Sequence, residues 1–101
     1  MRIRILPEAE RDLELGACFY ELQREGLGRY FNDCLMADIE SLQIYAGIHE
    51  KFDTLYRCLS KRFPFAIFYD LSAETVDVYA VLDCRQDPQE IENRLKSSRR
   101  N

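Results

Sequence analysis

The hydrophobic pattern changes its period near residue 50, which divides the chain into a helical part and a strand-rich part. Residues 2–6 alternate polar and apolar side chains, and this predicts a short strand with one buried face. Residues 7–26 and 31–45 carry apolar side chains at steps of three and four, so each segment predicts an amphipathic helix. Because only a short link at Leu27-Gly28 separates them, the two helices should form an antiparallel hairpin that Gly47 closes.

The second half of the chain predicts three strands and a last helix. Residues 54–62 and 75–84 alternate, residues 65–69 are nearly all apolar, and Phe63-Pro64 marks a corner between strands. In the third of these strands we expect an inward-facing row and an outward-facing row, the inward one being Val76, Val78, Ala80 and Leu82. Asp87 precedes Pro88 and should cap the final helix, whose apolar residues Ile91 and Leu95 are four apart.

The predicted order is therefore β-α-α-β-β-β-α in a single domain, residues 1–101. A run of strands after a helical hairpin is typical of the α+β class. We expect the hairpin to pack on one face of a twisted, antiparallel, four-stranded sheet.

Composition narrows the functional classes. With 47% hydrophobic and 32% charged residues the chain is typical of a soluble globular protein, and it has no apolar run of the roughly 20 residues that a membrane helix needs. Pro7 and the charges after it do not fit a signal peptide, so a cytoplasmic protein without membrane contact is expected.

The charge is uneven along the chain. Residues 1–50 carry five basic and ten acidic side chains, whereas residues 51–101 carry nine basic and eight acidic ones. A net charge of −4 argues against a broad grip on nucleic acid, so any such contact should be local. The basic residues of the second half form two clusters: Arg57, Lys61 and Arg62, then Arg94, Lys96, Arg99 and Arg100.

Four cysteines are widely spaced, and His49 is the single histidine of the sequence. A zinc site needs four ligands, usually in two close pairs, and this spacing offers none. We therefore expect four reduced thiols, no metal site and no cofactor.

Four motifs in one order resemble the RelE/ParE superfamily of small toxins. They are Pro7-Glu-Ala-Glu-Arg-Asp-Leu13, the basic strand Arg57 to Arg62, Phe63-Pro-Phe-Ala-Ile-Phe-Tyr69, and Arg85-Gln-Asp-Pro88. The resemblance implies a RelE-like fold and the toxin role in a type II toxin–antitoxin module, within the plasmid-stabilisation, ParE-like branch. Such a toxin binds a protein target such as DNA gyrase and is neutralised by a cognate antitoxin in a hetero-oligomer.

RelE-like members of the superfamily are instead ribosome-dependent endoribonucleases that cut messenger RNA without a metal. Arg57, Lys61 and Arg85 are the cations that would serve such a reaction. However, Asp83 stands where nuclease members often have a histidine, Gln86 replaces the second arginine of the motif, and no Tyr or His follows Pro88. The residues thus favour binding over catalysis, with ribosome or messenger RNA as the secondary expectation.

Three functions remain open: a ParE-like toxin, a nuclease, and a non-toxic binding module of the same fold. The expected target- or partner-binding residues are Arg57, Lys61, Arg62, Asp83 and Arg85. Instead of binding a partner, Arg57 and Arg85 could each form a surface ion pair with Asp77 or Asp83. The C-terminal basic cluster is expected to be a solvated, frayed end.

Overall fold

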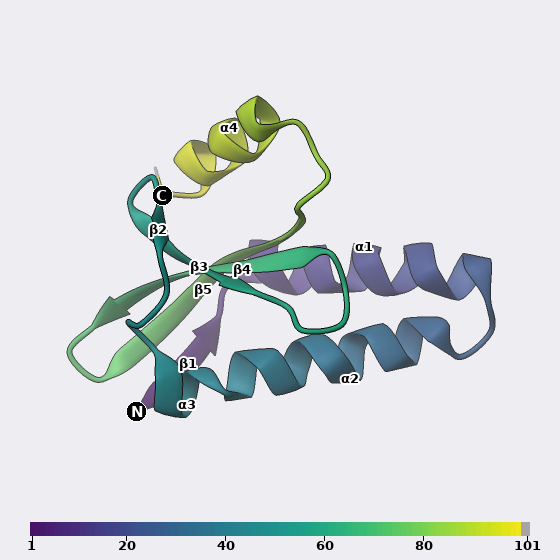
Figure 1. Ribbon diagram of the computed structural model, residues 1–101, viewed down its shortest axis with the longest axis horizontal. Helices are drawn as coiled ribbons and strands as arrows, with labels where there is room; N and C mark the ends of the chain where they lie inside the picture. The colour runs from purple at the N-terminus through teal and green to yellow at the C-terminus, as the bar shows by residue number, and fades with distance from the viewer. Residues whose placement is uncertain (100–101) are drawn as a thin grey trace.

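The computed structural model describes residues 1–99, which form helices and strands in the order shown in Figure 1. The first half contains β1 (Arg2–Ile5), α1 (Pro7–Gln23), α2 (Leu27–Glu40) and the single-turn helix α3 (Leu42–Tyr45). The second half contains β2 (Lys51–Phe52), β3 (Leu55–Leu59), β4 (Phe65–Ser72), β5 (Thr75–Asp83) and α4 (Pro88–Arg99). The α+β class is confirmed.

The sheet has five strands in the order β1-β5-β4-β3-β2, so the expected four-stranded antiparallel sheet is wrong in two details. First, β1 pairs with β5 in parallel, because the helical hairpin carries the chain away before it returns as the β3–β5 meander. Second, the sheet includes β2, a short strand that the sequence pattern did not predict, and it folds back on β3 through a turn where Asp53 has φ 61°.

The turn between α1 and α2 depends on a glycine in the left-handed conformation and on a glutamate side chain. Gly26 has φ 86°, a conformation that side chains disfavour, and it begins the turn into α2. The carboxylate of Glu21 accepts hydrogen bonds from the backbone N–H groups of Gly26 and Gly28, at 3.0 and 2.9 Å. A Cβ at Gly28 would lie 2.4 Å from the carbonyl oxygen of Ala17, so this glycine permits the close approach of α1 and α2.

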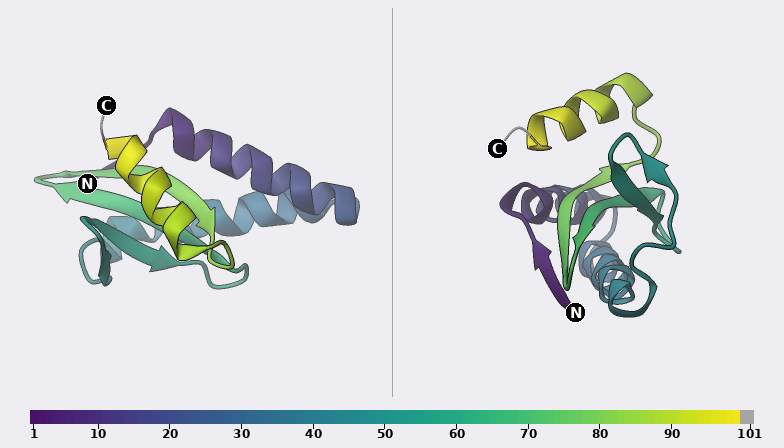
Figure 2. Two further views of the ribbon diagram at one scale, coloured as in Figure 1. Left: turned by 90° about the horizontal axis from the view of Figure 1, so that it is seen from above. Right: turned by 90° about the vertical axis from the view of Figure 1, so that its left-hand side faces the viewer.

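Helices cover both faces of the sheet, whereas we expected them on one face. The α1–α2 hairpin packs against one face, where Phe65, Ile67 and Tyr69 of β4 point. On the other face α4 places Ile91 and Leu95 against Ala66 and Phe68 of the same strand. Figures 1 and 2 show α4 and α2 on opposite sides of the strands. This two-sided burial explains why residues 65–69 are almost entirely apolar.

A β-bulge changes the faces that β5 presents. Phe68 pairs with Ala80 but Tyr69 pairs with Val78, so Tyr79 is an extra residue on β5. Val76, Val78 and Val81 consequently face the hairpin core, whereas Ala80 and Leu82 face α4. The predicted inward row of Val76, Val78, Ala80 and Leu82 is therefore wrong beyond the bulge.

Two local predictions are confirmed, namely the cap of the last helix and the glycine that follows the helical hairpin. The Asp87 carboxylate accepts a hydrogen bond from the Gln89 N–H at 2.9 Å and caps α4. Gly47, with φ 95°, follows α3. All four cysteines are free thiols. Within residues 1–99 no helix is both long and apolar enough to span a bilayer, and no cluster of three or more His, Cys, Asp or Glu side chains could hold a metal ion.

Candidate partner-binding surface

Along one face of α1, the N-terminal half is covered by α4 and the C-terminal half is exposed to solvent. Leu15, Phe19 and Leu22 lie at steps of four and three along this helix, and they are 58%, 51% and 90% exposed. Glu8 and Asp12 continue the same stripe toward the N-terminus of the helix, and there α4 lies against them. We call Leu15, Phe19 and Leu22 the bare stripe. Three large apolar side chains in a row on a helix are a typical docking surface.

A shallow hollow of about 220 Å³ runs beside the bare stripe. Leu15 and Phe19 form its helical wall, the end of β5 supplies Val81 and Leu82, and Gln86 lies at its rim. Gly16 also lines it, and a Cβ there would lie 2.6 Å from the ring of Phe31. The glycine thus lets the Phe31 ring of α2 pack directly beneath the hollow. An apolar floor with a polar rim suits an amphipathic partner segment.

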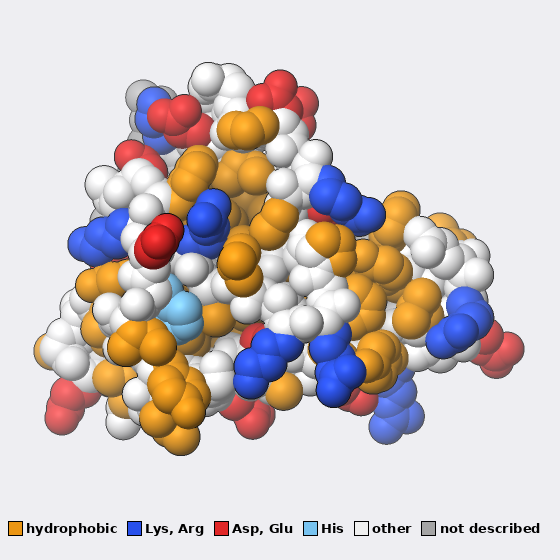
Figure 3. Space-filling model, in the orientation of Figure 1, with side chains coloured by type: hydrophobic (Ala, Val, Ile, Leu, Met, Phe, Trp, Pro, Cys, Tyr) orange, Lys and Arg blue, Asp and Glu red, His pale blue; other side chains and the backbone are white. Residues whose placement is uncertain are grey.

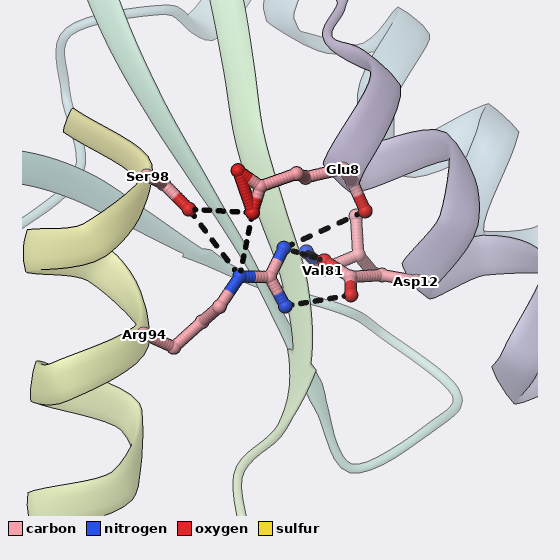
Figure 4. A network of polar contacts seen from close by, with 5 residues as sticks. All are labelled: Glu8, Asp12, Val81, Arg94 and Ser98. Atoms are coloured by element: carbon pink, nitrogen blue, oxygen red, sulfur yellow. Dashed lines mark hydrogen bonds and ion pairs between the residues drawn. The ribbon is translucent and has the colours of Figure 1, made fainter. Parts of the chain in front are cut away.

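A buried ion pair fixes α4 at the other end of the stripe (Figure 4). The guanidinium of Arg94 donates to both carboxylate oxygens of Asp12, at 2.8 and 2.7 Å, and Asp12 is only 9% exposed. The Val81 N–H of β5 donates to the same carboxylate at 3.0 Å. Asp12 therefore joins α1, α4 and the sheet. The hydrogen bonds to Asp12 raise the pKa of Arg94, and the geometry is that of a strong bidentate pair.

Glu8 and Ser98 complete this contact. The Ser98 hydroxyl lies 3.3 Å from a carboxylate oxygen of Glu8, and Arg94 lies 3.4 Å from that oxygen. The C-terminal basic cluster is therefore not wholly a solvated, frayed end, because Asp12 and Glu8 hold the Arg94 side chain. Lys96 pairs with Glu92 one turn earlier at 3.3 Å. The Arg99 side chain and Arg100 lie outside the described residues.

Asp83 and Arg85 lie together at the end of β5, as the ion-pair alternative expected. Two guanidinium nitrogens of Arg85 donate to the Asp83 carboxylate at 2.9 and 2.7 Å. These bonds lower the pKa of Asp83 and raise the pKa of Arg85. The Asp83 side chain also borders the hollow beside the bare stripe, so the pair lies at its rim.

Arg57 lies elsewhere, on the face that α4 covers. Its guanidinium is 5.8 Å from the centre of the Phe52 ring, and it lines a hollow of about 100 Å³ with Phe68, Leu82 and Cys84. No carboxylate, histidine or tyrosine is among the residues that line this hollow. Arg57 makes no ion pair with the described side chains, so the expected pairing across the sheet with Asp77 or Asp83 is wrong. Asp77 pairs with Arg4 instead, at 2.8 Å.

Lys61 and Arg62 form a third location, beside α2. The predicted strand to residue 62 ends at Leu59, so Lys61 does not share a strand face with Arg57. Asp38 of α2 is buried and holds the following turn by accepting hydrogen bonds from the Ser60 hydroxyl, at 2.6 Å, and the Lys61 N–H, at 3.3 Å. Lys61 and Arg62 therefore border a hollow of about 420 Å³ against α2. Figure 3 shows basic side chains on this side of the molecule in separate places, not as one patch.

The five expected binding residues thus fall into three places, and only Asp83 and Arg85 lie beside the bare stripe. Sequence reasoning missed Asp12 and Arg94 because they are 82 residues apart. One signal was present: Asp12 falls on the same helical face as Ala9, Leu13 and Gly16, which are all buried. An acid on a buried face needs a partner.

No protein-family model and no curated protein matches the sequence. A solved structure described as the chromosomal ParDE TA (toxin–antitoxin) system from P. aeruginosa does contain a similar chain, with a TM-score of 0.70 at 14% identity. The likeness covers 80% of this chain and 92% of the other. This protein therefore shares its fold with a chain of that ParDE system. At this identity the likeness concerns the fold alone, and it agrees with the expected α+β class.

Proposed function

We propose that the protein is the toxin component of a type II toxin–antitoxin module, ParE-like, which binds a protein target such as DNA gyrase and is neutralised by a cognate antitoxin. The observation that carries the proposal is the fold, which a chain of a ParDE toxin–antitoxin system shares along most of its length. We place the module among the plasmid-stabilisation systems and the protein in the cytoplasm, where its four free thiols would stay reduced.

The bare stripe supports an antitoxin partner. An antitoxin segment that folds on binding needs apolar surface to offset the entropy of ordering. Leu15, Phe19 and Leu22 provide that surface next to a ready hollow, and the Asp83–Arg85 pair at its rim can set register and orientation. We propose that an amphipathic antitoxin helix covers this stripe and that toxin and antitoxin form a hetero-oligomer.

The arrangement of the cations supports binding over catalysis. A nuclease would need Arg57, Lys61 and Arg85 around one phosphate, with an acid and a base in reach. Arg57 faces α4, Lys61 lies against α2, and Arg85 is already held by Asp83. The three side chains would serve three different surfaces, so ribosome-dependent cleavage is the secondary candidate.

Controlled expression tests the proposal against its two alternatives. The chain is induced alone and together with any short open reading frame beside its gene, and growth, plasmid supercoiling and messenger-RNA ends are followed. A toxin of the proposed kind arrests growth and relaxes plasmids, and the neighbouring product restores both. Codon-specific messenger-RNA ends that vanish in Arg57→Ala would establish the nuclease instead. Unchanged growth and supercoiling, with the neighbouring product still bound, would establish the non-toxic binding module.

A further inference from the structure

A small hollow lies between α4 and the sheet, on the face away from the helical hairpin. Its volume is about 100 Å³, and Phe68, Leu82 and Ile91 supply apolar walls from β4, β5 and α4. Figure 3 shows hydrophobic side chains gathered beneath α4, with a basic side chain at their margin. A cavity of about 150 Å³ with apolar walls accepts benzene, so this hollow has room for a short aliphatic group. We call it the Arg57 hollow.

The charged end of Arg57 lies beside this hollow. Its guanidinium carbon is 5.8 Å from the centre of the Phe52 ring, and Phe52 lines the hollow. The Cys84 thiol also lines it. Burial raises the pKa of this thiol, and the nearby charge of Arg57 opposes part of that rise. No ion pair joins Arg57 to another side chain among residues 1–99, so its charge is available to a ligand.

The lining of the hollow suits a ligand with one charged end and one apolar end. Arg57 is the single charged residue among the described residues that line it, and a planar guanidinium matches the two oxygens of a carboxylate. A phosphate group carries more oxygens and more charge than one guanidinium can satisfy, and the remainder would lie against apolar walls. An aliphatic group is stabilised by those same walls, because it leaves water.

The surroundings of the hollow favour a free molecule over a polypeptide segment. α4 forms one side through Pro88 and Ile91, and the segment before it contributes Cys84 and Gln86. Ile91 and Leu95 of α4 pack directly against the sheet. A backbone that continues on both sides of an inserted residue would have to displace some of these contacts, whereas a small molecule would not.

We propose that the Arg57 hollow binds a short aliphatic carboxylate of the kind represented by isovalerate. The carboxylate pairs with the Arg57 guanidinium, and the aliphatic end packs against Phe68, Leu82 and Ile91. Because such a ligand contacts both the sheet and α4, its binding stabilises the folded chain. The site is separate from the bare stripe and does not depend on the toxin role, so it can be tested on the purified chain.

A nuclear magnetic resonance titration of the isotope-labelled full chain tests the class of ligand. Isovalerate is compared with isoamyl alcohol, which lacks the charge, and with acetate, which lacks the branched aliphatic group. We expect isovalerate to shift the amide signals of Phe52, Cys84 and Ile91, with a dissociation constant on the order of 1 mM for a ligand of this size. The alcohol and acetate should each bind at least about tenfold more weakly, because each keeps only one of the two contacts.

Two variants separate the hollow from general charge. Arg57→Gln removes the charge and leaves the apolar walls, so isovalerate should bind at least about tenfold more weakly. Isoamyl alcohol should bind this variant as it binds the wild type, which also shows that the hollow is still folded. Lys61→Gln removes an equal charge beside a different hollow and should leave isovalerate binding unchanged.

Two exposed thiols provide a second measurement. Cys84 lines the Arg57 hollow, whereas Cys18 lies on α1 and lines a different one. Saturating isovalerate should slow alkylation of Cys84 by iodoacetamide at least about fivefold, because an occupied hollow shields the thiol. Alkylation of Cys18 should be unchanged, and most of the protection of Cys84 should disappear in Arg57→Gln.

Other outcomes would overturn the proposal. Tighter binding of inorganic phosphate than of isovalerate would identify an anion site of another kind. Tighter binding of acetyl-Gly-Gly-Val with a free carboxylate would identify a site for the end of a protein chain. Signal changes centred outside the hollow, or undiminished isovalerate binding by Arg57→Gln, would show that Arg57 holds no such ligand.

Discussion

At the scale of single residues, Asp12 links three elements that are distant in sequence. It receives Arg94 from α4 and the Val81 N–H from β5 while it lies on α1. Its position near the start of an acidic helix did not indicate which groups it would contact, because a surface acid is equally favourable there. The cap at Asp87 could be predicted because its partner, the Gln89 N–H, lies two residues away. The partner of Asp12 could not, since nothing local specifies a contact between opposite ends of the chain.

We expect Asp12→Ala to destabilise the fold by about 3 kcal/mol, because it leaves Arg94 and the Val81 N–H without their acceptor. Denaturant unfolding measures the loss. Arg4→Ala is the matched control, since it removes an arginine from an exposed carboxylate pair and should cost far less. Equal losses in the two variants would show that Asp12 does not join the elements.

His49 should make stability depend on pH. The Gly47 N–H donates to the Tyr69 hydroxyl at 2.9 Å, and the same hydroxyl forms a hydrogen bond with Nδ1 of His49, 2.5 Å away. Burial lowers the pKa of His49 below its ordinary value of 6.5, so the folded state favours the neutral ring. The unfolded chain then binds more protons, and stability is present above about pH 6.5 and falls as the pH decreases below it.

Unfolding midpoints between about pH 7.5 and pH 5 measure this dependence. His49→Gln keeps an acceptor for the hydroxyl but does not titrate, so its stability should change less over the same range. Asp83, whose pKa is lowered from 3.8, affects the pH dependence of stability only at lower pH. If stability depended on pH in the same way in the wild type and in His49→Gln, the role given to His49 would be contradicted.

At the scale of elements, periodicity predicted the hairpin, the three-stranded meander and the last helix, but not how they pack. A bulge at Tyr79 and an apolar strand buried on both faces leave no distinct trace in a period-two pattern. The same limit applies to the candidate site. Arg57, Lys61 and Arg62 are close in sequence, and they separate because β3 ends at Leu59 and Asp38 holds the turn that follows.

The bare stripe should matter for binding and little for folding. Leu22→Glu places a charge at a position that is 90% exposed, so stability should change by less than about 0.5 kcal/mol. Affinity for the antitoxin should fall by at least about tenfold, because the partner's apolar anchor would meet a charge. Ile44→Glu on α3, at a position 79% exposed and outside the stripe, is the control that should leave affinity unchanged. Calorimetry on both variants decides whether the stripe is the docking surface.

At the scale of the whole molecule, a net charge of −4 prevents broad attraction of an acidic antitoxin. In the proposed complex, apolar burial with a few local ion pairs would then supply the affinity. Raising salt from about 0.05 to 0.5 M should therefore weaken the complex by less than about tenfold, because exposed pairs are screened and apolar contacts are not. Calorimetry across that range measures it, and a loss of a hundredfold or more would mean that charge dominates.

We propose that the chain inhibits its target by binding, as a ParE-like toxin. Purified protein is added to DNA gyrase with relaxed plasmid and ATP, with and without the neighbour-gene product, and a parallel sample is added to translating ribosomes. We expect that supercoiling is inhibited, that the neighbour-gene product restores it, and that messenger RNA stays intact. Full supercoiling activity together with codon-specific cleavage on the ribosome would contradict it.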